Sequence, residues 1–189
     1  MKQFCRILAL LLVLPLALSF FSCAAGEEDV PAGFIRAENP GADYSFHYPE
    51  TWLLDRSDAG MTSVFVSEND FTNLSVTAFT ADTRYADLPT YAEEYYFKQM
   101  EGNLNGFQVE RNQDGSLKRT VMKVDGLDTI AVNYSAVLGG ETYQYRIWFI
   151  SYNGYIYHVQ YCAKVTGERD FYQEHLDEAE AIVSYLRFN

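Results

Sequence analysis

Turn dipeptides in the C-terminal half constrain the fold of this chain more than any other feature of its sequence. They occur at spacings of 11, 14 and 14 residues and are Asp114-Gly115, Asp125-Gly126, Gly139-Gly140 and Asn153-Gly154. Such dipeptides supply the positive φ angles that tight β-hairpin turns require. The runs that follow them are rich in β-branched and aromatic residues and cover 116–124, 127–137, 142–152 and 155–163. This pattern predicts an antiparallel meander.

Two-residue turns also fix the register of the strands that they join, and the register assigns each side chain to a face of the sheet. The last turn predicts these pairs: Tyr152 with Tyr155, Ile150 with Tyr157, Phe149 with His158, Ile147 with Gln160 and Tyr145 with Cys162. The turn before it predicts three more: Tyr134 with Tyr145, Val132 with Ile147 and Ile130 with Phe149. One face then carries Ile130, Val132, Tyr134, Tyr145, Ile147, Phe149, Ile156 and Cys162. The opposite face, polar at one side and aromatic at the other, carries Ala131, Asn133, Ser135, Arg146, Trp148, Ile150, Tyr157, Val159 and Tyr161.

Both faces are too apolar to be fully wet, so each needs at least a partial cover, and two predicted helices can supply it. The first is indicated by apolar residues at helical spacing, Leu88, Tyr91, Ala92, Tyr95, Tyr96 and Met100, before a stop at Gly102 and Asn103. The second begins at a capping box of Asp170 and Gln173, and its apolar stripe is Tyr172, Leu176, Ala179, Ile182, Val183 and Leu186. The N-terminal half adds strands near 34–38, 44–48, 63–68 and 74–79. The predicted fold class is α+β, an antiparallel sheet flanked by helices.

An aromatic segment in the N-terminal half, 44–52, reads YSFHYPETW. Its alternation points Tyr44, Phe46 and Tyr48 to one face of a strand and His47 to the other. Because the following proline cannot donate to a ladder, the strand ends there and the chain turns, which returns Trp52 towards the sheet. A buried aromatic cluster explains the segment without a ligand.

The N-terminus has the three-part layout of an export signal, with Lys2 and Arg6 before an apolar run over 7–21. This run of 15 residues is shorter than the roughly 20 that a spanning helix needs. The segment that ends in Ser22-Cys23 resembles a bacterial lipobox, in which the cysteine carries diacylglycerol and becomes the first mature residue; ordinary cleavage near Ala25 is the alternative. We therefore predict a lipoprotein-type signal peptide over 1–22 with lipid attachment at Cys23, a short acidic tether over 23–32 and a single domain over 33–189.

Charge and cysteine content fit an exported protein that reaches the membrane through lipid. Cleavage before Cys23 would leave 12 of the 14 basic residues against 26 acidic ones, a net charge of −14. Such a chain is repelled by phosphate backbones and anionic headgroups, which excludes nucleic acid as an expected partner. Cys162 would be the single remaining cysteine without a lipid, so no intrachain disulfide is expected. We expect localisation at the outer face of the cell membrane, held there by the lipid anchor.

Several points along the chain resemble the PsbP-like and DcrB-like superfamily. They are the entry segment Phe46, Tyr48, Pro49 and Trp52, then Val124-Asp125-Gly126, the tyrosine-rich hairpin over 143–161 and the closing helix that ends at 182–188. The resemblance covers roughly 33–188 and implies a PsbP-like α/β/α sandwich. One member of that superfamily is an extrinsic subunit of the photosystem II oxygen-evolving complex, and many bacterial members are surface lipoproteins of unassigned role. None of that subunit's metal-binding or docking residues can be placed on this chain.

Catalytic or metal chemistry is not indicated by the residues that could perform it. His158 and Cys162 share a face of one strand but lie about 13 Å apart along it, too far for a nucleophile and its base. The histidines, His47, His158 and His175, have no ligand spacing, and the acidic pairs Asp55/Asp58 and Asp82/Asp87 lack the graded pattern of a calcium loop. The sequence therefore predicts a protein that is not an enzyme and has no cofactor or metal site.

The last prediction concerns an interaction surface. Tyrosine and tryptophan commonly anchor interfaces, and the aromatic side of the second sheet face offers a candidate docking patch of Arg146, Trp148, Tyr157 and Tyr161. In the other interpretation, the C-terminal helix lies over these residues. The predicted function is a membrane-tethered extracytoplasmic lipoprotein that acts as a non-catalytic accessory module with a protein partner. The alternative is a surface protein that binds a small ligand or calcium.

Overall fold

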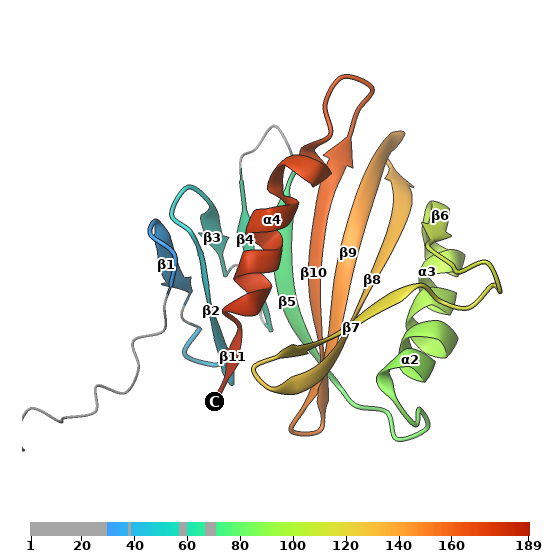
Figure 1. Cartoon of the computed structure of the whole chain (residues 1–189), viewed down its shortest axis with the longest axis horizontal. Coiled ribbons are helices and arrows are strands. Elements are labelled where there is room, and N and C mark those ends of the chain that lie inside the picture. Colours follow the sequence, from blue (N-terminus) through green and yellow to red (C-terminus); the bar gives the residue numbers. More distant parts are fainter. Residues whose placement is uncertain (1–29, 38, 57–59, 67–70) are drawn as a thin grey trace, which may run out of the picture. The chain divides into compact units, whose positions relative to one another are not determined.

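An antiparallel sheet of eight strands dominates the described part of the chain (Figure 1). The computed structural model describes residues 30–37, 39–56, 60–66 and 71–189. The predicted signal peptide and Cys23 lie outside the described residues. The strand order is β3-β4-β5-β10-β9-β8-β6, and β7 also pairs with β8. The strands are β3 (Leu53–Asp55), β4 (Met61–Phe65), β5 (Asn73–Thr80), β6 (Asn105–Val109), β7 (Arg119–Val124), β8 (Leu127–Leu138), β9 (Glu141–Tyr152) and β10 (Tyr155–Val165).

The meander predicted from the turn dipeptides is confirmed, since β7, β8, β9 and β10 pair in sequence order. All eight residue pairs predicted across the last two turns occur in the observed register. Asn153 and Gly154 have φ angles of 48° and 79°, as their tight turn requires. The turn at Asp114-Gly115 differs, because it closes a small excursion between Arg111 and Leu117 and does not join two long strands.

A helical segment covers one face of the sheet, as predicted. It consists of α2 (Leu88–Tyr91), the π-helical turn η1 (Ala92–Phe97) and α3 (Lys98–Asn103). Asp87 caps its first turn, because its side chain accepts a hydrogen bond from the Thr90 N–H at 2.8 Å. The core beneath this segment contains every residue that the sequence placed on that face. We call it the helix-side core.

The opposite face is covered by α4 (Phe171–Ser184), which crosses in front of β10 and β5 in Figure 1, and by a second, three-stranded sheet. The second sheet has the order β1-β2-β11, with β1 (Phe34–Ala37), β2 (Tyr44–Pro49) and β11 (Arg187–Phe188). The described chain is therefore richer in sheet than a balanced α+β sandwich. The difference arises because β2 hydrogen-bonds to β1 and to the C-terminal β11 and not to the main sheet.

The aromatic segment over 44–52 forms part of the core on this face, which we call the α4-side core. Tyr44, Phe46, Tyr48 and Trp52 are all buried in it, as predicted. The Trp52 indole N–H donates a hydrogen bond to Glu178 of α4 at 3.2 Å, so the tryptophan is fixed against that helix. His47 lies on the other side of β2 against the ring of Tyr185. Among the described residues, no helix has the length and apolar content needed to cross a membrane.

Candidate functional site

Three residues of the predicted docking patch belong to the core, which corrects that prediction. Trp148, Tyr157 and Tyr161 are at most 1% exposed. The Tyr161 hydroxyl donates to the backbone carbonyl of Tyr172 in α4 at 2.9 Å, and the Tyr157 hydroxyl donates to the Asp43 carboxylate at 2.6 Å. The physical reason is that α4 and the small sheet lie over these rings, so they do not form an exposed surface.

Arg146, the fourth residue of that patch, lies at the polar end of the same face and is only partly covered. Its guanidinium lies 5.4 Å from the ring centroid of Trp148, within the range of a cation–π contact. Nη1 donates to Oδ1 of Asn133 at 3.3 Å, and Nη2 forms an ion pair with Glu180 at 3.2 Å. A guanidinium has five N–H donors, and the buried Nε has no hydrogen-bond partner among the described residues. Arg146 is therefore held firmly while donors remain unused.

A cavity of about 360 Å³ opens beside Arg146. It lies between the first turns of α4 and the strands β6, β8 and β9. Its lining residues are Gln108, Val109, Glu110, Asn133, Tyr134, Ser135, Gln144, Tyr145, Arg146, Tyr172, Gln173 and Leu176. The sequence placed Asn133, Ser135 and Arg146 on the polar side of this face, and the structure brings them together here. Most of the lining side chains can donate or accept hydrogen bonds, so the cavity suits a polar group. We call it the Arg146 cavity.

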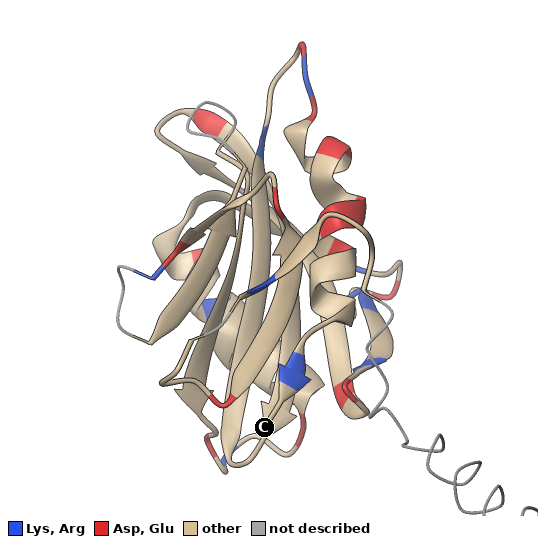
Figure 2. Ribbon diagram, turned by 90° about the vertical axis from the view of Figure 1, so that its left-hand side faces the viewer, with Lys and Arg blue, Asp and Glu red and all other residues tan. Residues whose placement is uncertain are grey.

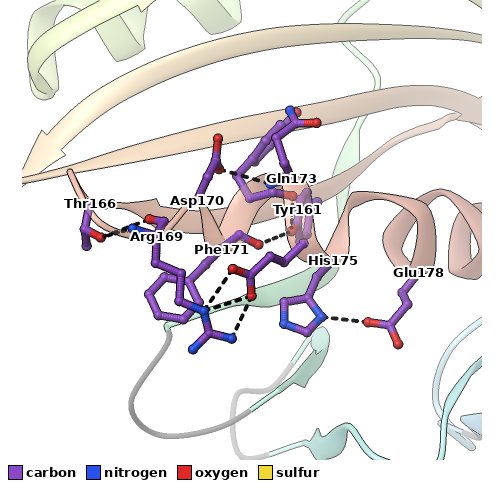
Figure 3. A network of polar contacts seen from close by, with 10 residues as sticks. Tyr161, Thr166, Arg169, Asp170, Phe171, Gln173, His175 and Glu178 are labelled. Atoms are coloured by element: carbon purple, nitrogen blue, oxygen red, sulfur yellow. Dashed lines mark hydrogen bonds and ion pairs between the residues drawn. The ribbon is translucent and has the colours of Figure 1, made fainter.

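A network of polar contacts fixes the first turn of α4, which forms one wall of the Arg146 cavity (Figure 3). The Asp170 side chain accepts a hydrogen bond from the Gln173 N–H at 3.1 Å, as the predicted cap requires. Arg169 pairs with Glu174 through Nε at 2.9 Å to each carboxylate oxygen. Together with the bond from the Tyr161 hydroxyl, these contacts position Tyr172 and Gln173 before any ligand arrives. Figure 2 shows that α4 also carries several acidic residues, of which Glu180 pairs with Arg146.

A second cavity, of about 470 Å³, lies on the other face of β6. Its lining residues are Glu93, Phe97, Lys98, Glu101, Phe107, Gln108, Val109 and Arg111. The rings of Phe97 and Phe107 lie with their centroids 6.1 Å apart, and Arg111 forms an ion pair with Glu93 at 2.7 Å. The cavity thus combines aromatic side chains with charged ones. We call it the Phe107 cavity.

Sequence reasoning missed β6 and therefore both of the cavities beside it. The strand begins with a bulge between Asn105 and Gln108, so period-2 alternation covers only Phe107, Gln108 and Val109, fewer residues than the roughly four to eight of a recognisable strand pattern. Gly106 has a φ of 60°, and a Cβ added there would lie 2.8 Å from Cγ2 of Val137. The sequence signal that could have located the Arg146 cavity was the set of polar residues that β8 and β9 carry on the same face.

The helix-side core also contains buried polar side chains, and they bond to one another. The Tyr91 hydroxyl lies 2.9 Å from Nε2 of His158, while the Tyr96 and Tyr134 hydroxyls both donate to Oε1 of Gln160 at 2.9 and 2.8 Å. Burial lowers the pKa of His158 to about 3 and raises the pKa of Tyr96 to about 12. Both side chains are therefore neutral near pH 7.

Cys162 has the properties of an inert core thiol. Burial raises the pKa of the thiol, and this effect is larger than the opposing effect of a hydrogen bond from the Asn73 side chain. The resulting pKa is about 11. That amide lies 3.2 Å from the sulfur. A thiol with this pKa contains almost no thiolate at pH 7, and the thiolate is the nucleophile.

The acidic pairs considered as calcium ligands have other roles where the structure describes them. Asp82 pairs with Arg84, whose hydrogen bonds hold the pKa of that carboxyl below its usual value. Asp87 caps the helical segment, and Asp58 lies outside the described residues. Among the described residues, no group of three or more His, Cys, Asp and Glu side chains could hold a metal ion.

No family model matches this sequence. No curated protein sequence matches it either. Solved structures do share the fold. Mog1p of Saccharomyces cerevisiae, described as a Ran-binding protein, has a TM-score of 0.56 at 10% identity and covers 82% of this chain and 95% of its own. PsbP (CyanoP) of Synechocystis has a TM-score of 0.53 at 12% identity and covers 88% of this chain and 99% of its own.

A protein of Bacteroides thetaiotaomicron has a TM-score of 0.51 at 16% identity over 82% of this chain, which spans 48% of that protein's chain. The fold is PsbP-like. At these identities the likeness concerns the fold alone, so a function must be argued from the site.

Proposed function

We propose that this chain is an exported, lipid-anchored accessory module that performs no catalysis and holds a partner at the Arg146 cavity. The observation that carries the proposal is the state of Arg146. Its guanidinium is fixed by Trp148, Asn133 and Glu180, yet donors remain unused beside a polar cavity of about 360 Å³. A pre-organised donor that loses little freedom on binding is a favourable recognition group.

The chemistry of the buried residues supports binding over catalysis. His158 is neutral and bonded to Tyr91, and Cys162 has a raised pKa, so neither is poised as a base or a nucleophile. One protein of similar fold, Mog1p, is described as Ran-binding, which provides a precedent for protein binding on this fold. The lipobox-like Ser22-Cys23 supports the anchor.

A small polar ligand is the second candidate, because a volume of about 360 Å³ falls within the usual range of small-molecule sites. Native mass spectrometry of the chain purified from its own cells separates the two candidates. A bound molecule that is retained by the unsubstituted protein and absent from Arg146→Met would favour the small ligand. An unliganded protein together with a cross-linked partner would favour the accessory module.

The anchor and the site are tested separately in cells. Cys23→Ala is expected to abolish metabolic acyl labelling and to release the protein from the membrane fraction; unchanged labelling and fractionation would refute the anchor. A photo-crosslinking residue at Gln144, which lines the Arg146 cavity, is expected to capture a partner that the same residue at the distant, exposed Asp128 does not capture. Loss of that adduct in Arg146→Met would support the site. An equal adduct from both positions would refute it.

A further inference from the structure

Strand β6 forms one edge of the main sheet, at the side of the sheet near α3 in Figure 1. Within the described chain it pairs with β8 and with no second strand. Just beyond it, the Glu110 N–H donates to the Asn133 carbonyl of β8 at 3.0 Å. Because successive residues of a strand direct their backbone groups to opposite sides, the N–H and C=O of Val109 point away from β8. The edge therefore offers a donor and an acceptor to a further strand.

The residues of β6 do little to block such a strand. Natural edge strands are commonly protected by proline or by charged residues such as lysine. The sequence of β6 is Asn-Gly-Phe-Gln-Val, which contains neither a charge nor a proline. Its protective features are its length of five residues and a bulge at its start, and the bulge lies at the end away from Val109.

The two cavities lie on opposite faces of this same edge. Gln108 pairs with Ser135, which places its side chain on the face of the Arg146 cavity. Val109 pairs with Tyr134 of the helix-side core, and Phe107 also packs there and lines the Phe107 cavity. Gln108 and Val109 contribute to the lining of both cavities. Since neighbouring side chains of a strand point to opposite faces, a strand added here would direct one residue towards each cavity.

We propose that a protein partner adds an extended segment to β6 as a further strand, with adjacent side chains in the Arg146 and Phe107 cavities. This inference rests on the proposed function and names its partner class. Main-chain hydrogen bonds would supply affinity, and the two cavities would supply specificity. Gln108 and Ser135, on the side of the Arg146 cavity nearest to β6, can donate to an oxygen acceptor from Asp, Asn, Glu or Gln, and the rings of Phe97 and Phe107 select an apolar neighbour.

Charge favours a different protein over a second copy of this chain as the source of the segment. The full sequence carries a formal net charge of −12, so two copies repel each other. The charged side chains that line the Phe107 cavity balance one another, with Glu93 and Glu101 against Lys98 and Arg111, so the negative charge of the whole chain sets the preference. A segment with lysine or arginine on either side of the central pair therefore fits this surface best.

The test uses the purified full chain and an array of immobilised peptides of about nine residues, enough for one typical strand. Each peptide contains one hydrogen-bond acceptor residue for the Arg146 cavity and one leucine or phenylalanine for the Phe107 cavity. The remaining positions are threonine and valine, with a lysine at each end. In one set the two residues are adjacent, and in the matched set one residue separates them, which places both on the same face. Binding by the adjacent set alone is expected. Equal binding by both sets would overturn the two-cavity arrangement.

Backbone pairing is tested on the peptide side, where no variant can fail to fold. N-methylation of the best peptide at successive positions should weaken binding by about ten-fold or more at the one residue whose N–H reaches the Val109 carbonyl, which is 1.4 kcal/mol for that lost contact. Val109→Pro should weaken binding similarly, because it removes the outward N–H from an edge position that tolerates proline. Val109→Thr, which keeps that N–H, is the matched control and should bind within about three-fold of the unsubstituted chain.

The outcomes separate this inference from the proposed function. If every N-methylated peptide binds equally well but Arg146→Met abolishes binding, strand addition is refuted and the accessory role stands. The same conclusion follows if no peptide binds while the residue at Gln144 still captures a partner in cells. If sedimentation shows a dimer that Val109→Pro dissociates, β6 pairs with a second copy and the inference is overturned.

Discussion

Two polar clusters, one on each face of the main sheet, are hydrogen-bonded to different extents. Beneath the helical segment, Tyr91 bonds to His158, and Tyr96 and Tyr134 share the carbonyl oxygen of Gln160. At the polar end of the α4 face, the Nε of Arg146 has no hydrogen-bond partner among the described residues, and a cavity lies beside this side chain. A saturated polar network specifies a core, whereas donors left over beside a cavity indicate a binding site. The difference lies in how completely each group is bonded, since both sets are largely buried.

The largest effect expected from this comparison concerns Trp148, which supports Arg146 from within the core. Trp148→Ala should lower the free energy of unfolding by about 4 kcal/mol, the usual cost of deleting a large buried aromatic side chain. Chemical denaturation measures this directly. The control is Val121→Ala at a strand residue that is 69% exposed, where a change within about 0.5 kcal/mol is expected. A small loss of stability in Trp148→Ala would mean that Trp148 is exposed, and it would support the docking patch predicted from the sequence.

Much of the main sheet could be predicted because its signals are local. The turn dipeptides set the register, and the register alone assigned residues such as Ile147 and Trp148 to their faces. The pairing of β2 with β1 and β11 could not be predicted in this way, because no short turn joins β2 to β11. β6 could not be predicted because the bulge near Gly106 leaves only three alternating residues, fewer than a strand pattern requires.

The candidate site was predictable only in part, for a different reason. Sequence pattern placed Arg146 and Trp148 on the same face correctly, but exposure depends on which element lies above each residue. Trp148 is 1% exposed, whereas the Arg146 side chain is 17% exposed although it pairs with Glu180 of α4. A period in the sequence gives the face of a residue and carries no information on how completely a covering helix shields it.

The second largest effect tests the helix-side network through pH. The folded pKa of His158 is about 3, against 6.5 for an unperturbed histidine, because burial disfavours its charged form. Between these values the unfolded chain binds a proton that the folded chain does not, so stability falls as the pH falls. The slope approaches about 1.4 kcal/mol per pH unit below pH 6.5, and the expected loss of stability between pH 6.5 and 4.5 is roughly 2.3 kcal/mol.

The measurement is the free energy of unfolding at several pH values for the unsubstituted chain and for His158→Gln. Other groups titrate in both proteins, so the difference between the two curves gives the contribution of His158 to the pH dependence of stability. That difference should change with pH below 6.5 and be flat above it. Parallel curves across this range would mean that His158 is accessible to protons, and the contrast between the two faces would then weaken.

The smallest stability effect is expected at Arg146, although its effect on binding should be complete. Arg146→Met keeps the packing of the aliphatic stem on Trp148 and removes a partly exposed ion pair with Glu180, so stability should change by about 1 kcal/mol or less. Gln160→Leu is the matched substitution in the other core. It leaves the Tyr96 and Tyr134 hydroxyls without their acceptor and should cost about 2 kcal/mol. Its effect on partner capture from Gln144 should be small, because Gln160 lies on the opposite face. If Arg146→Met proved as destabilising as Gln160→Leu and left capture intact, Arg146 would be a structural residue like those of the helix-side core.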